Sequence, residues 1–317
     1  MANFYGQFIG FGAGGAVAGY SYMGSNYGYT HGGESANPTP INVIDKFPFA
    51  SDSDAGDVGD LTTSPDYASG TSSTTHGYRA GGGGGPPGSN VIDKYSYAAD
   101  GDATDVGDLV VPTGSAGGMS SELKGYICGG YNTSLGPYLN TIQSFLYASD
   151  GDSTDVADMT ESKLQVSGAT DTVNGYTMNG SSGTPMYSTV ERFVYSSEAD
   201  STDIGEMTLV RYCPGGASSA THGYAFAGGH VHGTMYDRID KFNFAGSFSS
   251  TDVGNVLAGR QGPACQSSTV SGYCTGGTTD NTNGSNVIQK VDFSSDGDST
   301  DVGNLTGLMQ YGAGSHY

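Results

Sequence analysis

Apolar and polar residues alternate in a short segment that recurs six times along the chain. In the copy that starts at Asn42, "NVIDKFPF", Ile44 points to one face of the expected strand, and Phe47 and Phe49 point to the other. Alternation with a period of two is the pattern of a packed β-strand. Because both faces are apolar in part, we expect this strand to lie between other layers. The six copies start at Asn42, Asn90, Asn140, Ser188, Asp237 and Asn286.

These starts are 48, 50, 48, 49 and 49 residues apart, and three other patterns keep the same period. A Ser- and Gly-rich segment comes first, then a Gly-Tyr pair followed by small residues, and an acidic segment such as "DVGDL" follows the alternating strand. We call the four expected strands A (Ser/Gly-rich), B (Gly-Tyr), C (alternating) and D (acidic). A repeat of about 49 residues with four strands predicts a propeller blade. The Gly-Tyr pairs are assigned to Tyr20, Tyr78, Tyr126, Tyr176, Tyr224 and Tyr273.

The six units predict one domain, a ring of six blades over residues 19–305, with the two ends of the chain left over. The tail at 306–317 matches the segment that starts at Met207, so it predicts one more strand A that closes the ring. The segment 1–18 competes for that place as a first inner strand, and the alternative is an attachment arm. Closure by either end would pair backbone groups that an open edge leaves exposed.

The repeat resembles kelch-type β-propeller repeats. Arg211 and Arg260 stand at the Arg position of that family, and Gly81-Gly82 and Gly129-Gly130 stand at its double glycine. The resemblance implies an all-β fold, a six-bladed kelch-like β-propeller with four short antiparallel strands per blade. The chain departs from the family because it has no Trp, and Val or Ile fills the Trp position in all six units, as in "VGDL" from Val58. Propellers host unrelated activities, so the architecture leaves the function open.

Charge narrows the choice of partners. The net charge of the 317-residue chain is -21, and only eleven Lys and Arg residues are present. Nucleic acids and anionic membranes both require clustered basic residues, so we expect neither as a partner. No apolar run is long enough to cross a bilayer, so no membrane insertion is expected. Four cysteines are too few for a disulfide scaffold, and Cys265 and Cys274, on neighbouring strands, are the one pair for which a disulfide is the alternative.

The acidic segment between strands C and D has two interpretations. "DGDST" places oxygen atoms at alternate positions, which is how an EF-hand loop begins its calcium site. Asp155 stands where that loop needs Gly, and the copy from Gly246 lacks most carboxylates. The other interpretation is a structural turn, which Asp, Gly, Ser and Thr all favour. If Ca²⁺ is a cofactor, the candidate ligands are Asp100, Asp102, Asp150, Asp152, Asp296 and Asp298.

The loops between strands B and C differ most between the units, and variable loops on a rigid frame often carry binding. Tyr, Asn and His side chains there are suited to stacking on sugars or packing on a partner protein. No nucleophile elbow, zinc-protease helix or phosphate-binding loop is present, so we expect no enzymatic activity. The candidate binding residues are Tyr27, Tyr29, His31, Tyr131, Asn132, Tyr138, His230, His232 and Tyr236.

The Gly-, Ser- and Tyr-rich acidic repeats also resemble the virion and tail-fibre proteins of marine tailed bacteriophages. This resemblance implies a non-enzymatic structural or recognition component of a tail, fibre or capsid surface. Its partners would be other virion proteins, or a glycan or protein on the host surface. The protein would be made in the host cytoplasm and released in virions by lysis. The alternative is a calcium-dependent lectin or adhesin that acts outside a bacterium or on its surface.

Overall fold

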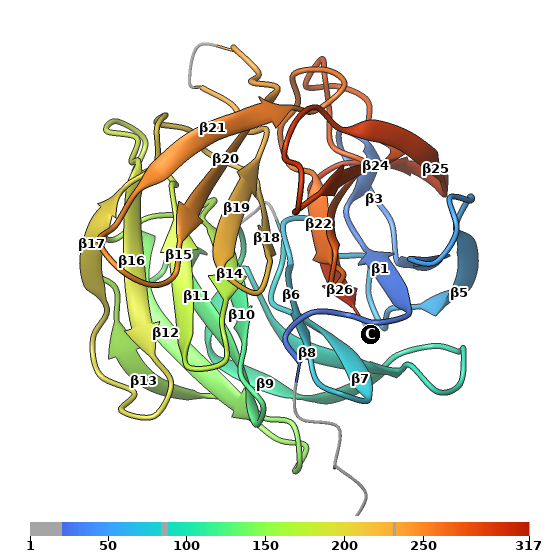
Figure 1. The fold of residues 1–317 in the computed structure, drawn as a ribbon. Helices are drawn as coiled ribbons and strands as arrows, with labels where there is room; N and C mark the ends of the chain where they lie inside the picture. The colour runs from blue at the N-terminus through green and yellow to red at the C-terminus, as the bar shows by residue number, and fades with distance from the viewer. Residues whose placement is uncertain (1–20, 84–87, 231–232, 317) are drawn as a thin grey trace, which may run out of the picture.

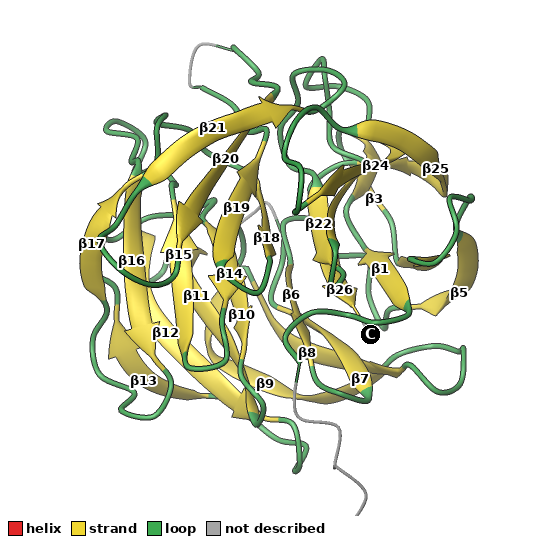
Figure 2. Ribbon diagram, in the orientation of Figure 1, coloured by secondary structure: helices red, strands yellow, loops and turns green. Residues whose placement is uncertain are grey.

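The computed structural model describes residues 21–83, 88–230 and 233–316. Every regular element in these residues is a β-strand (Figure 2). Six four-stranded antiparallel sheets stand around a central axis, with strand A innermost and strand D at the circumference (Figure 1). The fold is therefore a six-bladed β-propeller, as the repeat predicts. No helix in these residues has the length and apolarity that crossing a membrane requires.

The first three blades contain twelve of the strands, which follow the order A to D from the axis outward. Blade 1 consists of β26 (Ala313–His316), β1 (Tyr27–His31), β4 (Val43–Pro48) and β5 (Gly56–Asp60). Blade 2 consists of β6 (Ser69–Ser72), β7 (His76–Ala80), β8 (Ser89–Ser96) and β9 (Thr104–Thr113). Blade 3 consists of β10 (Gly117–Ser120), β11 (Lys124–Asn132), β12 (Gly136–Leu146) and β13 (Thr154–Asp158).

The other three blades follow the same order. Blade 4 consists of β14 (Ser167–Thr170), β15 (Asn174–Met178), β16 (Thr189–Val194) and β17 (Thr202–Glu206). Blade 5 consists of β18 (Gly215–Ser218), β19 (His222–Phe226), β20 (Arg238–Asn243) and β21 (Ser250–Asn255). Blade 6 consists of β22 (Ala264–Ser267), β23 (Ser271–Thr275), β24 (Ser285–Asp292) and β25 (Thr300–Met309). A hairpin of β2 (Glu34–Ala36) and β3 (Thr39–Pro40) forms the B–C loop of blade 1.

Strand B of blade 1 lies later in the chain than the sequence assignment placed it. The assignment of this blade's Gly-Tyr pair to Tyr20 is wrong. Strand B is β1, which is built on Gly28-Tyr29 and is followed by the double glycine Gly32-Gly33. Tyr29 and Tyr78 are 49 residues apart, so the corrected pair restores the regular period.

The C-terminal strand supplies strand A of blade 1. β26 pairs antiparallel with β1, and the partners run from Gly28 with His316 to His31 with Ala313. The first blade therefore combines strands from both ends of the chain, and this pairing closes the ring. The segment 1–18, which the sequence analysis considered as an inner strand or an attachment arm, lies outside the described residues.

Pairs of aromatic rings join each blade to the next, stacked at four junctions and tilted by 31° at two. The Tyr of strand B packs on the aromatic residue that directly follows strand C in the following blade, with ring centroids between 4.7 and 5.0 Å apart. These contacts contribute apolar burial at each junction of a propeller that has no Trp. The six pairs are Tyr29–Tyr97, Tyr78–Tyr147, Tyr126–Tyr195, Tyr176–Phe244, Tyr224–Phe293 and Tyr273–Phe49.

A closed ring of backbone hydrogen bonds surrounds the axis where the D–A connections enter strand A. One residue per blade donates its N–H to the carbonyl of the equivalent residue in the preceding blade, at distances of 2.6 to 3.1 Å. All six have positive φ angles, between 50° and 63°. The members are Tyr67, Ser115, Gln165, Cys213, Gly262 and Tyr311.

A second closed ring lies at the other end of strand A. In this ring each backbone N–H donates to the side chain of the equivalent residue in the following blade, and His316 takes part through Nδ1. Between the two rings the inner strands are in close contact: a Cβ atom at Gly118 would lie 2.2 Å from the carbonyl oxygen of Gly70. The members of this side-chain ring are Ser72, Ser120, Thr170, Ser218, Ser267 and His316.

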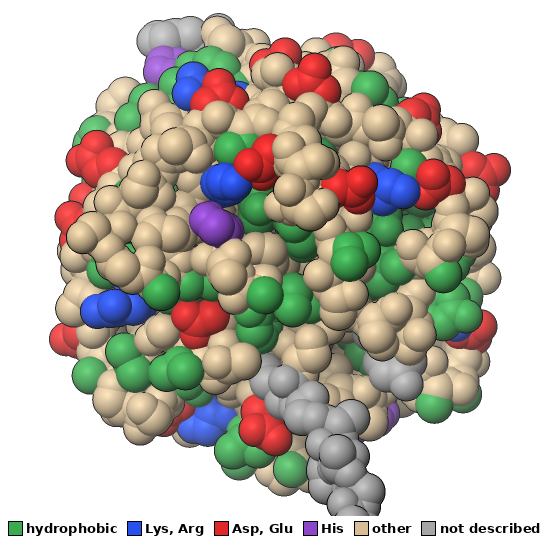
Figure 3. All heavy atoms as spheres, viewed as in Figure 1, with side chains coloured by type: hydrophobic (Ala, Val, Ile, Leu, Met, Phe, Trp, Pro, Cys, Tyr) green, Lys and Arg blue, Asp and Glu red, His purple; other side chains and the backbone are tan. Residues whose placement is uncertain are grey.

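The outer strands carry much of the negative charge. Exposed carboxylates occur on all six D strands, and Figure 3 shows acidic side chains around the outline of the molecule. Charges on an edge strand oppose pairing with another chain, so these residues protect the circumference against edge-to-edge association. They are Asp57, Asp60, Asp105, Asp108, Asp155, Asp158, Asp203, Glu206, Asp252 and Asp301.

Candidate functional site

The acidic C–D turns bind neighbouring blades together. In blade 2, Asp100 forms an ion pair of 2.8 Å with Lys46 of blade 1, and Asp102 accepts a hydrogen bond of 3.0 Å from the backbone N–H of Asp60. We call this arrangement the acidic clamp: two turn acids that hold a cation and a backbone N–H of the preceding blade. The same clamp is formed by Asp52 and Asp54, by Asp150 and Asp152, and by Asp296 and Asp298.

Two blade junctions vary the clamp. In blade 4, Glu198 and Asp200 take the two acidic places, and Lys124 of strand B supplies the cation because Ser144 replaces the Lys of strand C. Blade 5 lacks the two acids, and there Phe248 packs over Gly205 while the Ser250 hydroxyl donates to the Glu206 carbonyl. The clamp therefore occurs at five of the six blade junctions, which explains why the acidic segment recurs with the blade.

The candidate calcium ligands all belong to these clamps. Asp100, Asp150 and Asp296 are in ion pairs with lysines, at distances of 2.8, 2.8 and 2.5 Å. Asp102 and Asp152 each accept a backbone N–H, and Asp298 accepts from both nitrogens of Asn255. The described residues contain no group of three or more His, Cys, Asp and Glu side chains arranged to hold a metal ion. The geometry thus assigns these carboxylates a structural partner in the preceding blade.

We expect the melting temperature to be the same, within about 1 °C, in millimolar calcium and in chelator, because a ligand stabilises a fold only when it binds the folded state. The measurement is a thermal melt of the full chain at constant ionic strength. Magnesium serves as the control for the general effect of a divalent ion on an acidic protein. A calcium-specific rise of several degrees would show that at least one clamp opens to bind the metal.

A buried polar layer lies inward of the clamps. The fourth residue of the "NVIDKF" segment reaches the start of the D–A connection of the preceding blade. In blade 2, Asp93 is fully buried, accepts from the Thr62 hydroxyl at 2.5 Å and pairs with Arg79 at 2.5 Å. In blade 3, the Gln143 amide occupies the same place and makes two hydrogen bonds to the Val111 backbone. The layer residues are Asp45, Asp93, Gln143, Glu191, Asp240 and Gln289.

Two buried histidines make the fold sensitive to acid. Burial lowers the pKa of His316 from 6.5 to about 4, and burial together with Arg79 lowers that of His31 from 6.5 to about 3. The unfolded chain therefore binds more protons than the folded chain as the pH falls from about 6.5 to about 4, so these groups reduce stability over that window. In the side-chain ring, Nδ1 of His316 faces the Ser267 N–H at 3.4 Å, and protonation removes this acceptor.

We expect His316 to account for a loss of about 2 kcal/mol between pH 7 and pH 5. The variant His316→Asn, which keeps an acceptor in place of Nδ1, is expected to have a shallower dependence of unfolding free energy on pH than the wild type. Denaturant titrations at several pH values measure both slopes. Comparison of the two slopes is needed because Glu34 acts in the opposite direction, since burial raises its pKa to about 7. Equal slopes would contradict the assignment.

The structure places six candidate binding residues in strands and not in loops, and three of them belong to blade 1. Tyr27, Tyr29 and His31 lie in β1, so the prediction that they belong to a B–C loop is wrong. Tyr29 and His31 are each 1% exposed, and Tyr29 belongs to the aromatic stacks between blades. The error follows from the mistaken Gly-Tyr assignment, which extended the loop backwards into the strand. The period of the other five Gly-Tyr pairs is the signal that identifies Gly28-Tyr29 instead.

Asn132 is a structural turn residue. It is 2% exposed, its amide donates to the Pro112 carbonyl at 2.7 Å, and its oxygen accepts from the Ser134 N–H at 2.8 Å. Asn132 and the half-buried Tyr131 lie in β11, and the half-buried Tyr138 lies in β12, so the prediction that these three belong to a B–C loop is also wrong. His230 and Tyr236 are half-buried and lie in the B–C loop of blade 5. His232 lies outside the described residues.

A shallow depression marks the centre of the B–C loop face. It has a volume of about 80 Å³ and is formed by the six residues of the backbone ring and their neighbours. Tyr67 and Tyr311 stack across it with ring centroids 4.1 Å apart, and the Tyr311 hydroxyl accepts from Gln261 at 2.7 Å. The sequence analysis missed these two tyrosines. Alignment of the D–A connections would have identified them, because they are equivalent to Ser115 and Cys213 of other blades.

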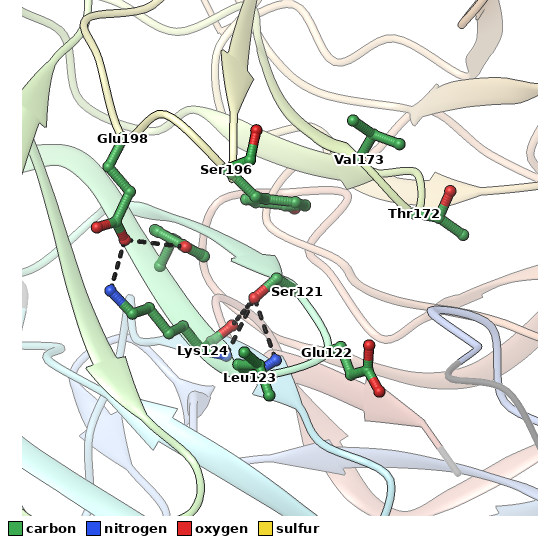
Figure 4. Close-up of a pocket in the computed structure, with 10 residues that line it drawn as sticks. Ser121, Glu122, Leu123, Lys124, Thr172, Val173, Ser196 and Glu198 are labelled. Atoms are coloured by element: carbon green, nitrogen blue, oxygen red, sulfur yellow. Dashed lines mark hydrogen bonds and ion pairs between the residues drawn. The ribbon is translucent and has the colours of Figure 1, made fainter. Parts of the chain in front are cut away.

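A larger pocket, of about 330 Å³, lies between blades 3 and 4 on the opposite face (Figure 4). Its floor contains the stacked Tyr126 and Tyr195, and the exposed side chains of Leu123 and Val173 come from the A–B turns. On one side Glu198 accepts from Lys124 at 2.7 Å and from the Tyr126 hydroxyl at 3.1 Å (Figure 4). The pocket thus combines an apolar wall with the ion pair between Lys124 and Glu198. This ion pair belongs to the clamp whose cation comes from strand B.

Comparison with known proteins supports the fold. No protein-family model and no curated protein matches the sequence. Among solved structures, one titled "Structure of YjhT" matches with a TM-score of 0.67 at 13% sequence identity, over 80% of this chain and 88% of that chain. At this level of identity the likeness shows a shared β-propeller fold.

The likeness to YjhT corrects one expectation. The sequence analysis expected no enzymatic activity because no catalytic motif is present, and that expectation is wrong. It is overturned by the match, because the fold that the chain shares with YjhT hosts catalytic as well as binding functions. The absence of a linear motif therefore does not exclude catalysis in a ring whose faces combine residues from several blades.

Proposed function

We propose that the protein is a rigid recognition module of a phage virion that presents its B–C loop face to a partner protein or to a glycan of the host surface. The observation that carries the proposal is the division of roles within the repeat. The recurring residues are engaged between blades, in the aromatic stacks, the acidic clamps and the two central rings. The residues that differ between blades lie in the B–C loops, which include a two-stranded hairpin in blade 1.

The chemistry of this face is suited to a polar ligand with apolar faces, such as a sugar. Tyr138, Tyr131, His230 and Tyr236 are half-buried, so part of each side chain is accessible. Aromatic side chains of this kind contribute large contact areas at a small entropic cost. Opposite, the clamps and exposed acids make the other face and the circumference unfavourable for anionic polymers.

Binding to an array of bacterial surface glycans tests the recognition part of the proposal. The double variant Tyr138→Ala, His230→Ala is expected to lose at least about tenfold in affinity for any glycan bound by the wild type. The matched control is Leu123→Ala, Val173→Ala at the pocket of the opposite face, which is expected to bind as the wild type does. If the control loses binding and the loop variant does not, recognition resides at the other face and the proposal is wrong.

The virion part rests on the resemblance of the acidic repeats to virion proteins, and it has its own test. An antibody against the folded ring is expected to label purified particles of the phage that encodes the chain. A chain detected only in the soluble fraction of the lysate would contradict this part and leave the glycan result unaffected.

A further inference from the structure

In three blades, the carboxylate of the buried polar layer is paired with a buried cation. In blades 2, 4 and 5 the layer residue is acidic, and each carboxylate meets a buried cation. The three pairs are Arg79 with Asp93 at 2.5 Å, Lys163 with Glu191 at 2.7 Å, and Arg211 with Asp240 at 2.6 Å. Blades 3 and 6 have the neutral amides Gln143 and Gln289 in this position. In blades 2, 4 and 5, each buried carboxylate is therefore paired with a cation. Such pairing offsets the free-energy cost of removing the carboxylate from water.

Blade 1 breaks this rule. Asp45 is 5% exposed and accepts two hydrogen bonds from Thr306, one from the backbone at 3.0 Å and one from the hydroxyl at 2.6 Å. Among the described residues, no Lys, Arg or His nitrogen lies within 4.0 Å of its carboxylate. The positions that supply the cation elsewhere are neutral in this blade, because Thr30 is equivalent to Arg79, and Met309 is equivalent to Arg211.

A cavity of about 200 Å³ lies beside this carboxylate, between blades 6 and 1 and next to the B–C loop of blade 1. Both neutral replacements line it: Thr30 has a short side chain, and Met309 has no charged end. The space is thus bounded by the same positions whose side chains neutralise the layer carboxylate in blades 2 and 5. Its lining includes Thr30, Gly32, Val43, Asp45, Thr306 and Met309.

The cavity also keeps the positions of the other acceptors that a guanidinium uses in the sister blades. In blade 5, Nη1 of Arg211 donates to the carbonyls of Ala227 and Arg238 at 3.0 and 3.2 Å. In blade 2, Nη1 of Arg79 makes the equivalent bonds to Gly81 and Val91, at 3.0 and 3.3 Å.

Gly32 and Val43 are the equivalent residues of blade 1, since the Gly32 N–H donates to the Val43 carbonyl as Gly81 does to Val91. Both residues line the cavity. One carboxylate and two carbonyls therefore surround a space that, in two other blades, contains a guanidinium group.

We propose that this cavity is a binding site for a guanidinium group supplied from outside the blade, either as a small guanidinium compound or as an Arg side chain of a partner. The group would occupy the place of the Arg211 guanidinium, pair with Asp45 and donate to the carbonyls of Gly32 and Val43. This proposal goes beyond the recognition function above and rests on different residues. Burial raises the pKa of Asp45, as expected for a carboxylate that still lacks its counter-ion.

Calorimetric titration of the full chain with methylguanidinium tests the proposal. The wild type is expected to show saturable binding, and methylurea, a neutral analogue of the same shape, is expected to show none. The variant Met309→Arg introduces the side chain that blade 5 has at this position. It is expected to raise the melting temperature and to weaken methylguanidinium binding at least tenfold, because its own guanidinium fills the site.

A second variant, Asp45→Asn, removes the charge and retains an amide like those of blades 3 and 6, and it is also expected to lose at least tenfold in affinity. Met309→Arg keeps the test decisive if Asp45→Asn fails to fold. No saturable binding of methylguanidinium to the wild type, or wild-type affinity in folded Met309→Arg, would overturn the proposal.

The source of the group is distinguished by two further titrants. A short peptide with one central Arg is expected to bind at least tenfold more tightly than methylguanidinium if a partner's side chain is the natural occupant. Equal or weaker binding of the peptide would assign the site to a small compound. A matched Lys peptide is the control for charge alone, since an ammonium group lacks the planar fork of donors with which Arg79 and Arg211 reach a carboxylate and two carbonyls.

Discussion

A chain that ends at Gly312 is expected not to form a closed ring. Removing 313–317 deletes β26, which pairs with β1 over four residues and contributes His316 to the side-chain ring. It would expose the inner edge of β1 and leave the surfaces of β6 and β22 uncovered. Such an edge is a template for association with other chains. We expect the truncated protein to aggregate or to lack a cooperative thermal transition, measured by size-exclusion chromatography and near-UV circular dichroism.

The control for this truncation is deletion of residues 1–18, which lie outside the described residues and are expected to be dispensable for folding of the ring. Complementation provides a second arm: a synthetic peptide of residues 306–317, added to the shortened chain during refolding, is expected to restore a cooperative transition. A shortened chain that stays monomeric and melts within a few degrees of the wild type would show that β26 is an accessory strand.

The architecture was predictable because every blade of a propeller has the same four strands in the same packing environment. The alternating segment around Ile44 and Phe47 is needed in every blade, since strand C is covered on both faces, so its period is visible without a structure. The same logic explains the one error of assignment. Tyr20 and Tyr29 both belong to Gly-Tyr pairs, and only the spacing to Tyr78 distinguishes them.

The roles of the acidic residues were less predictable, because each acts across a blade junction. Asp100 and Asp102 are neighbours in sequence and resemble two ligands of one ion. In the fold they contact Lys46 and the Asp60 backbone, about 40 to 55 residues away in the preceding blade. The aligned repeats do not reveal the contact either, because the fifth copy lacks the acids while Arg192, the cation opposite it, is retained. Among the described residues, Arg192 has no carboxylate within 4.0 Å.

The site beside Asp45 shows a further limit of sequence reasoning. Alignment places Met309 opposite Arg211, but it does not reveal that blade 2 takes its cation from strand B, through Arg79. Only the structure shows that two different positions deliver a guanidinium to the same place. Blade 1 has Thr30 at the position of Arg79 and Met309 at the position of Arg211. That it lacks a cation for Asp45 is therefore recognised only when both positions are compared in the structure.

Arg211→Ala is expected to destabilise the fold by about 3 to 5 kcal/mol, which is the usual cost of leaving a buried charge without its partner. Arg211 and Asp240 are both fully buried, and the guanidinium also donates to the carbonyls of Ala227 and Arg238. Urea denaturation measures the change. Arg192→Ala is the matched control, because this exposed Arg has no ion pair within 4.0 Å among the described residues, and the expected change is within about 0.5 kcal/mol.

A double variant without either charge separates the charge from the packing. Arg211→Met combined with Asp240→Leu removes both charges and keeps most of the apolar volume, so its loss of stability is expected to be smaller than that of Arg211→Ala alone. The backbone bond from the Ala227 N–H to the Arg238 carbonyl involves neither of the two substituted side chains. If the double variant is as unstable as the single one, the contribution of Arg211 comes from its hydrogen bonds to the blade backbone, and the buried layer stabilises the ring through geometry more than through charge. The cavity beside Asp45 would then be a binding site whose affinity depends mainly on Gly32 and Val43.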